Sequence, residues 1–184
     1  MANPVVPLVP DEVELDAERR RVEILRGEEL PVSPTGFEHG VVVLAFGGLL
    51  RATALRSGVG EVVTEVGFRL AEDVLLAPDL ALVAADAVPK GSMRRRMIRG
   101  APRLAVEIVS PGQDAGELAE KIESYLSAGA EAVWVLDPSR AAVAVHEPGQ
   151  PVRLLRHEDS LAAGEMIPGF AMPVADVFAL VETV

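Results

Sequence analysis

RLAVEIVS at residues 103–110 and LLAPDLALV at residues 75–83 are the stretches that decide the fold. Both are apolar on their two faces, as expected for central strands of a sheet that is covered on both sides. One carboxylate interrupts each stretch, Glu107 in the first and Asp79 in the second. We therefore predict two central strands, over residues 104–109 and 74–83, each with an acid among apolar neighbours.

Helix and strand patterns alternate around these two strands. Residues 37–57 predict a helix, because Phe37, Val41, Leu44, Gly48, Ala52 and Leu55 recur near helical spacing. Residues 113–130 predict a second helix, which begins with Asp114 and Glu117 spaced as a capping box. Strands are predicted at residues 61–70, 133–136 and 141–146, and a hairpin at residues 21–32. The order helix, three strands, helix, strand predicts an α/β fold with a mixed central sheet and extra hairpins.

The length and composition predict one intracellular domain. A chain of 184 residues can bury a core without staples, so we expect a single domain at residues 21–184 after a loose segment at residues 1–20. The absence of cysteine excludes disulfides, thiolate zinc sites and cysteine nucleophiles. The first residues lack the pattern of a signal peptide, and we expect neither a membrane span nor a location outside the cytoplasm.

The net charge of −11 argues against a broad, sequence-independent grip on nucleic acid. The segment KGSMRRRMIRGAPR at residues 90–103 is an exception, because it holds about a third of the basic residues. Its candidate phosphate contacts are Lys90, Arg94, Arg95, Arg96 and Arg99. A solvated loop without a partner explains the same segment equally well.

Asp79, Glu107 and Lys121 are ionisable residues at positions that periodicity assigns to the interior. Lys121 belongs to the helical stripe of Leu118, Ile122 and Tyr125 that should pack on the sheet. Burying a lone carboxylate costs several kcal/mol unless it meets a cation or a proton. One Mg²⁺ or Mn²⁺ site served by the lysine would explain all three residues, since carboxylate oxygens suit these ions better than zinc. A buried salt bridge between Lys121 and one acid, with Glu117 as a surface pair, is the alternative.

The chain resembles the Uma-type restriction endonuclease family of the PD-(D/E)XK superfamily from residue 23 to residue 178. The resemblance rests on several motifs in order: EILRGEE, SPTGFEH, the PD of APDLALV, LAVEIVSPG, EKIESYLSAGAEAVWVLDP and IPGF before a short closing helix. It implies a restriction-endonuclease-like core of helix, three strands, helix and strand. That order agrees with the one obtained above from the residue patterns.

The resemblance also implies roles for individual residues. Asp79 corresponds to the metal-binding aspartate, and Glu107 to the acid of the (D/E)XK motif, with the Ile108 carbonyl as a further metal ligand. Ser110 stands where the superfamily has its lysine, and Lys121 on the following helix takes that place in this family. Glu38 resembles the acid of the first helix, with His39 beside it. A first-turn glutamate stabilised by the helix dipole and a surface histidine are the alternative interpretation of these two residues.

The expected function is a metal-dependent endonuclease that hydrolyses phosphodiester bonds in DNA, with Mg²⁺ or Mn²⁺ as cofactor. The competing hypothesis is a catalytically silent module that keeps the nuclease fold and binds a protein or nucleic acid partner. Apolar hairpin strands in the C-terminal half favour a homodimer, which would suit cleavage of two strands.

Overall fold

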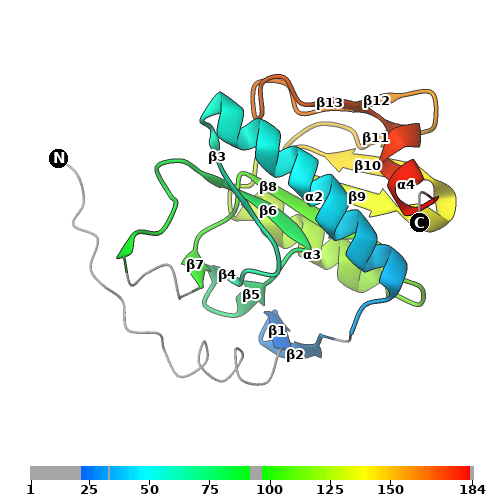
Figure 1. Cartoon of the computed structure of the whole chain (residues 1–184). Coiled ribbons are helices and arrows are strands. Elements are labelled where there is room, and N and C mark those ends of the chain that lie inside the picture. Colours follow the sequence, from blue (N-terminus) through cyan, green and yellow to red (C-terminus); the bar gives the residue numbers. More distant parts are fainter. Residues whose placement is uncertain (1–21, 33, 92–96, 183–184) are drawn as a thin grey trace.

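The computed structural model of the protein describes residues 22–32, 34–91 and 97–182 (Figure 1). The predicted loose segment at residues 1–20 and the basic residues Arg94, Arg95 and Arg96 lie outside the described residues. In chain order the elements are β1 (Val22–Leu25), β2 (Glu28–Pro31), α2 (Phe37–Ser57), β3 (Gly60–Val63), β4 (Phe68–Ala71), β5 (Val74–Leu76), β6 (Leu80–Ala84), β7 (Ile98–Arg99), β8 (Leu104–Ile108), α3 (Ala115–Ser127), β9 (Ala132–Asp137), the 3₁₀ turn η2 (Pro138–Arg140), β10 (Ala142–His146), β11 (Arg153–Leu155), β12 (Ser160–Ala162), β13 (Ala171–Pro173) and α4 (Val174–Glu182).

A six-stranded mixed sheet forms the centre of the fold. Its strand order is β11-β10-β9-β8-β6-β3, and only the β8 and β9 pair is parallel among these neighbours. Helix α3 connects β8 to β9, as a parallel crossover requires. The sequence α2, β3, β6, β8, α3, β9 is therefore the predicted order of helix, three strands, helix and strand.

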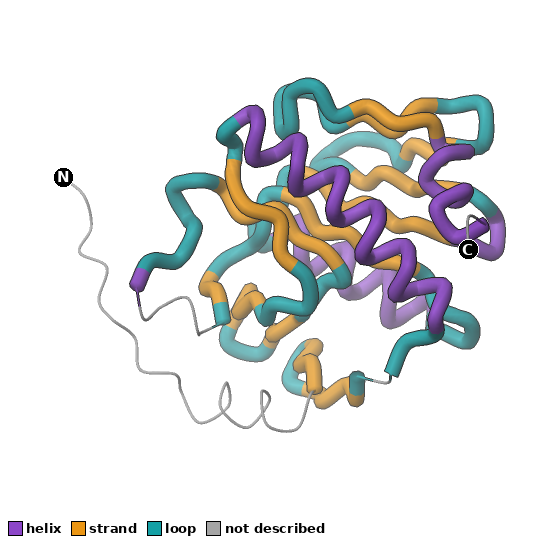
Figure 2. Tube along the Cα trace, viewed as in Figure 1, coloured by secondary structure: helices purple, strands orange, loops and turns teal. Residues whose placement is uncertain are grey.

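The two long helices lie on opposite faces of this sheet (Figure 2). On the first face, Phe46 of α2 packs with Trp134 of β9 and Phe170, with ring centroids 5.9 to 6.4 Å apart. On the second face, Ile122 and Tyr125 of α3 pack on the central strands. A smaller sheet of order β2-β1-β5-β4-β7 adjoins that second face, since Leu25 and Leu76 belong to the same cluster as Tyr125.

Helix α3 begins where the capping box predicts. The Asp114 side chain accepts a hydrogen bond from the Glu117 amide at 2.8 Å, which satisfies one of the free N–H groups of the first turn. The hairpin of β1 and β2 also matches its prediction. Its turn places Arg26 and Gly27 at φ of 53° and 79°, a geometry that glycine accepts readily.

Two predicted strands are wrong in their extent, and for one shared reason. The strand predicted at residues 61–70 is divided into β3 and β4, and the strand at residues 74–83 into β5 and β6. Together they form one long hairpin whose outer half, β3 with β6, lies in the central sheet and whose inner half, β4 with β5, lies in the smaller sheet. The two breaks face each other, because the Glu65 amide donates to the Pro78 carbonyl at 3.3 Å. Glu65 adopts a left-handed φ of 53° at this corner.

Helix α2 has the predicted bounds, but the residues whose spacing predicts the helix are not the residues that it buries. Val42, Phe46, Leu50 and Ala54 face the core and are fully buried. On the predicted stripe, by contrast, Phe37, Leu44 and Leu55 are 75%, 79% and 48% exposed. The helix is apolar on both sides, so hydrophobic spacing alone identifies the helix without identifying its core face.

Candidate active site

Asp79 lies at the corner of the bent hairpin, immediately before β6. Its Oδ2 accepts a hydrogen bond from the Ile108 amide at the end of β8, at 2.6 Å. Its Oδ1 lies 3.0 Å from Nε2 of His39 in the first turns of α2. The Asp79 carboxylate therefore ties together the start of β6, the end of β8 and the start of α2.

Glu107 is on the same side of the sheet as Asp79. Strands β6 and β8 pair with Leu80 opposite Val106, and one further step of this antiparallel register sets Asp79 opposite Glu107. Directly opposed residues share a face of a sheet. The predicted convergence of the two acids is therefore present in the fold.

The Glu107 carboxyl group is buried, and on balance its surroundings disfavour the charged form. It is 5% exposed and accepts a hydrogen bond from the Tyr125 hydroxyl at 3.0 Å. Its pKa is raised from 4.5 to about 8, chiefly by burial and then by the negative charge of Asp79, against the opposing effect of Lys121. Tyr125 itself has a pKa well above its ordinary value, chiefly because of burial and then because of Glu107.

Lys121 points inward, as its place on the apolar stripe of α3 predicts, and is 7% exposed. Its ammonium group forms an ion pair with Glu23 and lies 3.6 Å from the Glu117 carboxylate. Burial alone would lower the pKa of Lys121, but the charges of Glu23 and Glu107 outweigh burial and raise it. The lysine thus remains charged inside the protein.

Glu23 is a member of this cluster that the sequence did not reveal. It lies on β1, is 6% exposed, and accepts a hydrogen bond from the Ala77 amide at 2.7 Å while it pairs with Lys121. The buried salt bridge considered as an alternative for Lys121 exists, but its acid is neither Asp79 nor Glu107. The available signal was its spacing, since Glu23 shares a strand face with the buried Leu25 two residues later.

Glu38 and His39 differ in their relation to the site. Glu38 is exposed in the first turn of α2 and has no ion pair or hydrogen bond within the described residues. His39 instead contacts Asp79, and this hydrogen bond raises the pKa of His39 despite partial burial. Its Nδ1 atom is buried without a hydrogen-bond partner in the described part of the chain. The expected alternative of a surface histidine is therefore wrong.

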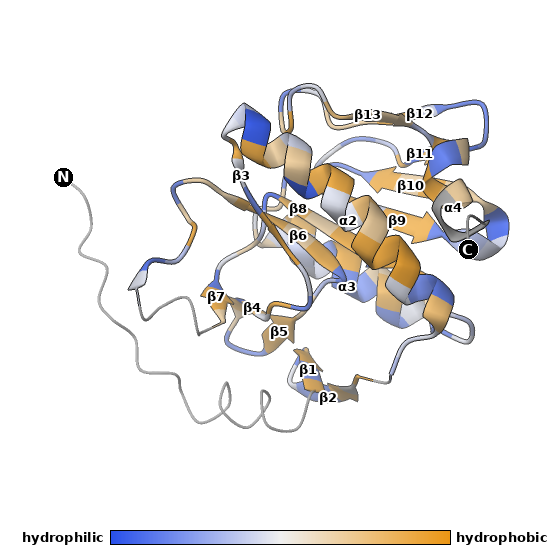
Figure 3. Ribbon diagram, viewed as in Figure 1, coloured by the Kyte–Doolittle hydropathy of each residue, from blue (hydrophilic) through white to orange (hydrophobic). Residues whose placement is uncertain are grey.

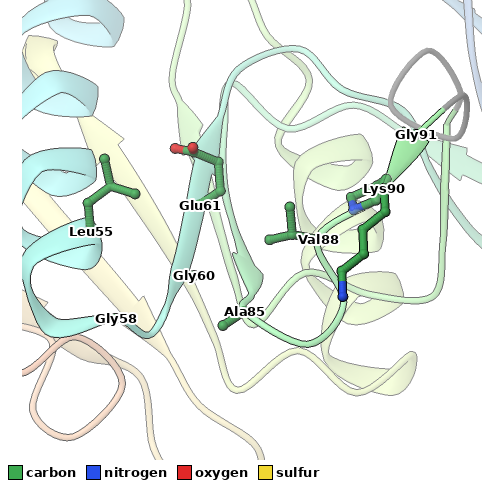
Figure 4. A pocket seen from close by; sticks show the side chains of 9 residues that line it. Leu55, Gly58, Gly60, Glu61, Ala85, Val88, Lys90 and Gly91 are labelled. Atoms are coloured by element: carbon green, nitrogen blue, oxygen red, sulfur yellow. The ribbon is translucent and has the colours of Figure 1, made fainter.

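The remaining basic residues are scattered. Lys90 and Arg99 are exposed at either side of the segment that falls outside the described residues. A hollow lined by Gly60, Glu61 and Lys90 opens beside β3 (Figure 4). None of the residues that line it belongs to the cluster around Asp79 and Glu107. Arg103 is held by a two-pronged ion pair with Glu131, at 2.6 and 2.9 Å.

The donor set at Asp79 and Glu107 fits a hard divalent cation that keeps much of its water. Within residues 22–32, 34–91 and 97–182 no three His, Asp or Glu side chains are grouped so as to hold a metal ion. Two carboxylates on one face remain, and their mutual repulsion contributes to the raised pKa of Glu107. A cation between them would remove that repulsion. Mg²⁺ and Mn²⁺ need only one or two protein carboxylates, because water molecules supply their other ligands.

A protein family and a solved structure are similar to this chain over most of its length. The model of the Uma2 family, described as "Putative restriction endonuclease", matches residues 10–175. A crystal structure of "a putative nuclease belonging to DUF820" from Anabaena variabilis superposes with a TM-score of 0.77 at 17% identity, over 87% of this chain and 90% of that one. A DrdV–DNA complex covers 76% of this chain and 11% of its own at 17% identity, with a TM-score of 0.38. No curated protein matches the chain.

The family model spans most of the chain, and the crystal structure shares its fold over nearly the whole length of both proteins. The core order of helix, three strands, helix and strand is the one that the restriction-endonuclease-like fold requires. The chain is therefore a member of the Uma2 family of nucleases and has the restriction-endonuclease-like fold.

Proposed function

We propose that the protein is a divalent-metal-dependent endonuclease that hydrolyses phosphodiester bonds in DNA. The observation that carries this proposal is the pair of Asp79 and Glu107 on one face of the sheet, with the charged Lys121 coupled electrostatically to Glu107. Buried ionisable groups with perturbed pKa values are typical of catalytic sites.

Asp79 and Glu107 would hold Mg²⁺ or Mn²⁺, with the Ile108 carbonyl as a further ligand. Such an ion supplies Lewis acidity and lowers the pKa of a bound water. The chain positions its own ligands before any ion arrives, because the Ile108 amide fixes one oxygen of Asp79 and the Tyr125 hydroxyl fixes one oxygen of Glu107. Groups that orient metal ligands in this way commonly raise metal affinity tenfold or more.

Lys121 would stabilise the negative charge that develops on the scissile phosphate or orient the attacking water. Glu23 keeps the ammonium group charged and fixes its place on the second face of the sheet. Electrostatic support of this kind is strongest where water is excluded, and the 7% exposure of Lys121 meets that condition.

DNA is the proposed substrate, and Lys90 and Arg99 are the described residues of the basic segment that would meet its phosphates. The family description supports a nucleic acid substrate. The net charge of −11 restricts any contact to a local surface. Binding should therefore be weak, with the shallow salt dependence that few phosphate contacts give.

Calorimetric titration with Mn²⁺ tests the metal site directly. The parent should release or absorb heat on binding, whereas Asp79→Asn should show at least a tenfold loss of affinity because one carboxylate charge is missing. Asp73→Asn is the matched control, since Asp73 is exposed in the turn between β4 and β5 and its carboxylate forms no hydrogen bond or ion pair with the described residues. Equal heats for all three proteins would place any metal site elsewhere.

Cleavage assays separate the enzyme from the silent module. Supercoiled plasmid and duplex RNA should be incubated with Mg²⁺, with Mn²⁺ or with a chelator. Nicking of the plasmid by the parent, lost in Asp79→Asn and Glu107→Gln and kept in Asp73→Asn, would support the proposal. DNA binding without cleavage, together with no Mn²⁺ binding, would favour the module, and cleavage of RNA alone would overturn the proposed substrate.

A further inference from the structure

The outward side of α2 is largely apolar. Four of the seven exposed large hydrophobic residues of the described chain lie on this helix: Phe37, Leu44, Leu49 and Leu55. Figure 3 shows apolar colour over much of α2, interrupted by hydrophilic segments toward its two ends. A surface helix of a soluble protein normally turns a polar face to water. The exposed face of α2 is thus typical of a helix that another surface covers.

This face, which we call the α2 stripe, consists of Phe37, Gly40, Val41, Leu44, Gly48, Ala52 and Leu55. At 100° per residue these positions lie within about 60° of one line along the helix. Arg51 lies within the same sector and is exposed, but Glu61 holds it in a two-pronged ion pair at 2.6 and 3.0 Å. The stripe is therefore apolar except for Arg51, whose charge the Glu61 carboxylate offsets.

The shape of the α2 stripe is complementary to itself. Leu44 projects into solvent, while a Cβ atom added at Gly48 or Gly40 would meet no atom within 4 Å. Two antiparallel copies related by a two-fold axis at position 46 would set Leu44 of each helix over Gly48 of the other. The same axis would set Phe37 beside Leu55 of the other helix, so two exposed apolar side chains would meet near each end of the contact.

Charge at the borders of the stripe is also complementary in this arrangement. Glu38 and Arg56 are 18 residues apart, which is five turns, and so lie on the same flank of the helix. A two-fold axis keeps this flank on one side of both helices and brings each Glu38 beside the other Arg56. Among the described residues Glu38 has no ion pair, and the Arg56 guanidinium donates only to Thr53 Oγ1, at 2.9 Å. Both charges thus remain free to pair across the contact.

We propose that α2 forms an antiparallel two-fold contact with α2 of a second copy of this chain. The contact is independent of the proposed nuclease activity. A helix of 21 residues is about 31 Å long, so the stripe alone falls short of the roughly 800 Å² per partner of a standard interface. The dimer should therefore dissociate on dilution, within a micromolar range that sedimentation can follow.

Sedimentation equilibrium of the parent, Leu44→Glu and Leu154→Glu across a range of concentrations tests the surface. Leu44 and Leu154 are 79% and 52% exposed, so neither change disturbs the core. The parent and Leu154→Glu should dimerise alike, whereas Leu44→Glu should weaken dimerisation about tenfold or more. A parent that stays monomeric throughout would overturn the proposal. A dimer that only Leu154→Glu disrupts would place the contact at β11 and overturn it as well.

Cysteine cross-linking tests the orientation, because the chain has no cysteine of its own. Phe37 and Leu55 are about 27 Å apart along the helix, so only an antiparallel contact brings one beside the other. A mixture of Phe37→Cys and Leu55→Cys should form a disulfide-linked dimer, and neither protein alone should do so. Cross-linking within either single variant, or none in the mixture, would contradict the antiparallel contact.

Discussion

Glu23 joins three separate parts of the molecule through one carboxylate. It sits on β1, accepts from the Ala77 amide at the hairpin corner, and pairs with Lys121 of α3. A buried charge pair contributes little net stability against a hydrophobic pair, yet loss of one partner is costly because the other is left buried and charged. The ion pair of Glu23 with Lys121 instead serves to hold the lysine near Glu107.

Glu23→Ala should therefore lower the free energy of unfolding by about 3 to 5 kcal/mol. Glu23→Gln should cost less, because the amide oxygen still accepts a hydrogen bond from one of the two donors, the Ala77 amide or the Lys121 ammonium group. Urea unfolding at neutral pH measures both values. Glu117→Gln is the matched control, because Glu117 is 35% exposed and 3.6 Å from the same lysine, and its loss should cost less than about 1 kcal/mol. Equal costs for Glu23→Ala and Glu117→Gln would contradict the assignment of Glu23 as the main partner.

Tyr125→Phe removes the hydroxyl that donates to Glu107 and keeps the ring that fills the core. The hydrogen bond lowers the pKa of Glu107, so its loss should raise that pKa and leave less of the ionised form for a metal ion. Mn²⁺ affinity at pH 7 should fall roughly tenfold. Calorimetry at pH 7 and pH 9 checks the cause, because the deficit should shrink at the higher pH. An unchanged affinity at both values would show that the hydroxyl does not tune the site.

The sequence revealed some members of the site and concealed others for clear physical reasons. Asp79 and Glu107 stand out because each is a lone charge in an otherwise apolar strand, and Lys121 because it interrupts an apolar helical stripe. Glu23 lies in a hairpin where charged residues alternate with apolar ones, so its burial depends on α3 packing above it. His39 lies in a first helical turn, and only the tertiary fold brings it to Asp79.

At the scale of elements, the close approach of α2 to β6 depends on Gly47. A Cβ atom at this position would lie 2.7 Å from Cδ2 of the buried Leu80, next to Asp79. The neighbouring Gly48 faces open space. Two adjacent glycines in one helix thus have different roles, one in packing the helix on the sheet and the other in leaving the α2 stripe flat.

Substitution of these two glycines should give opposite results. Gly48→Ala should stabilise the protein by roughly 0.5 to 1 kcal/mol, because alanine favours the helix and meets no atom. Gly47→Ala should lose that gain and cost about 1 to 3 kcal/mol, since Leu80 must move in a packed core. Urea unfolding of dilute samples, where dimerisation does not contribute, gives both values. A similar gain for both variants would show that α2 can move away from β6 freely.

The bent hairpin shows that a sequence pattern can predict a strand without predicting where that strand bends. Alternation and apolar runs continue across residues 61–70 and 74–83, so both segments were predicted as unbroken strands. The bend arises where Glu65 adopts a left-handed φ and where Pro78 precedes Asp79. A strand pattern shows which residues are buried, but it does not show which of two sheets each part of the strand joins. The bend that brings Asp79 close to β8 could therefore not be predicted from the sequence.

At the scale of the whole molecule, the raised pKa of Glu107 couples the site to folding. The group has a pKa of about 8 in the folded protein and an ordinary value of 4.5. Between these values the unfolded chain has released its proton while the folded chain retains it, so the free energy of unfolding falls as pH rises. Glu107→Gln cannot titrate, and should lose this slope between pH 5 and pH 8.

A divalent cation should reverse the trend, because it binds the ionised form of Glu107 and displaces the proton. Thermal unfolding at pH 6 and pH 8.5, with and without Mn²⁺, measures the coupling. The rise in melting temperature on adding Mn²⁺ should be larger at pH 8.5, and small at both values in Glu107→Gln. Equal stabilisation of the parent at both pH values would mean that the ion binds without Glu107. In that case no cation would offset the repulsion between Asp79 and Glu107.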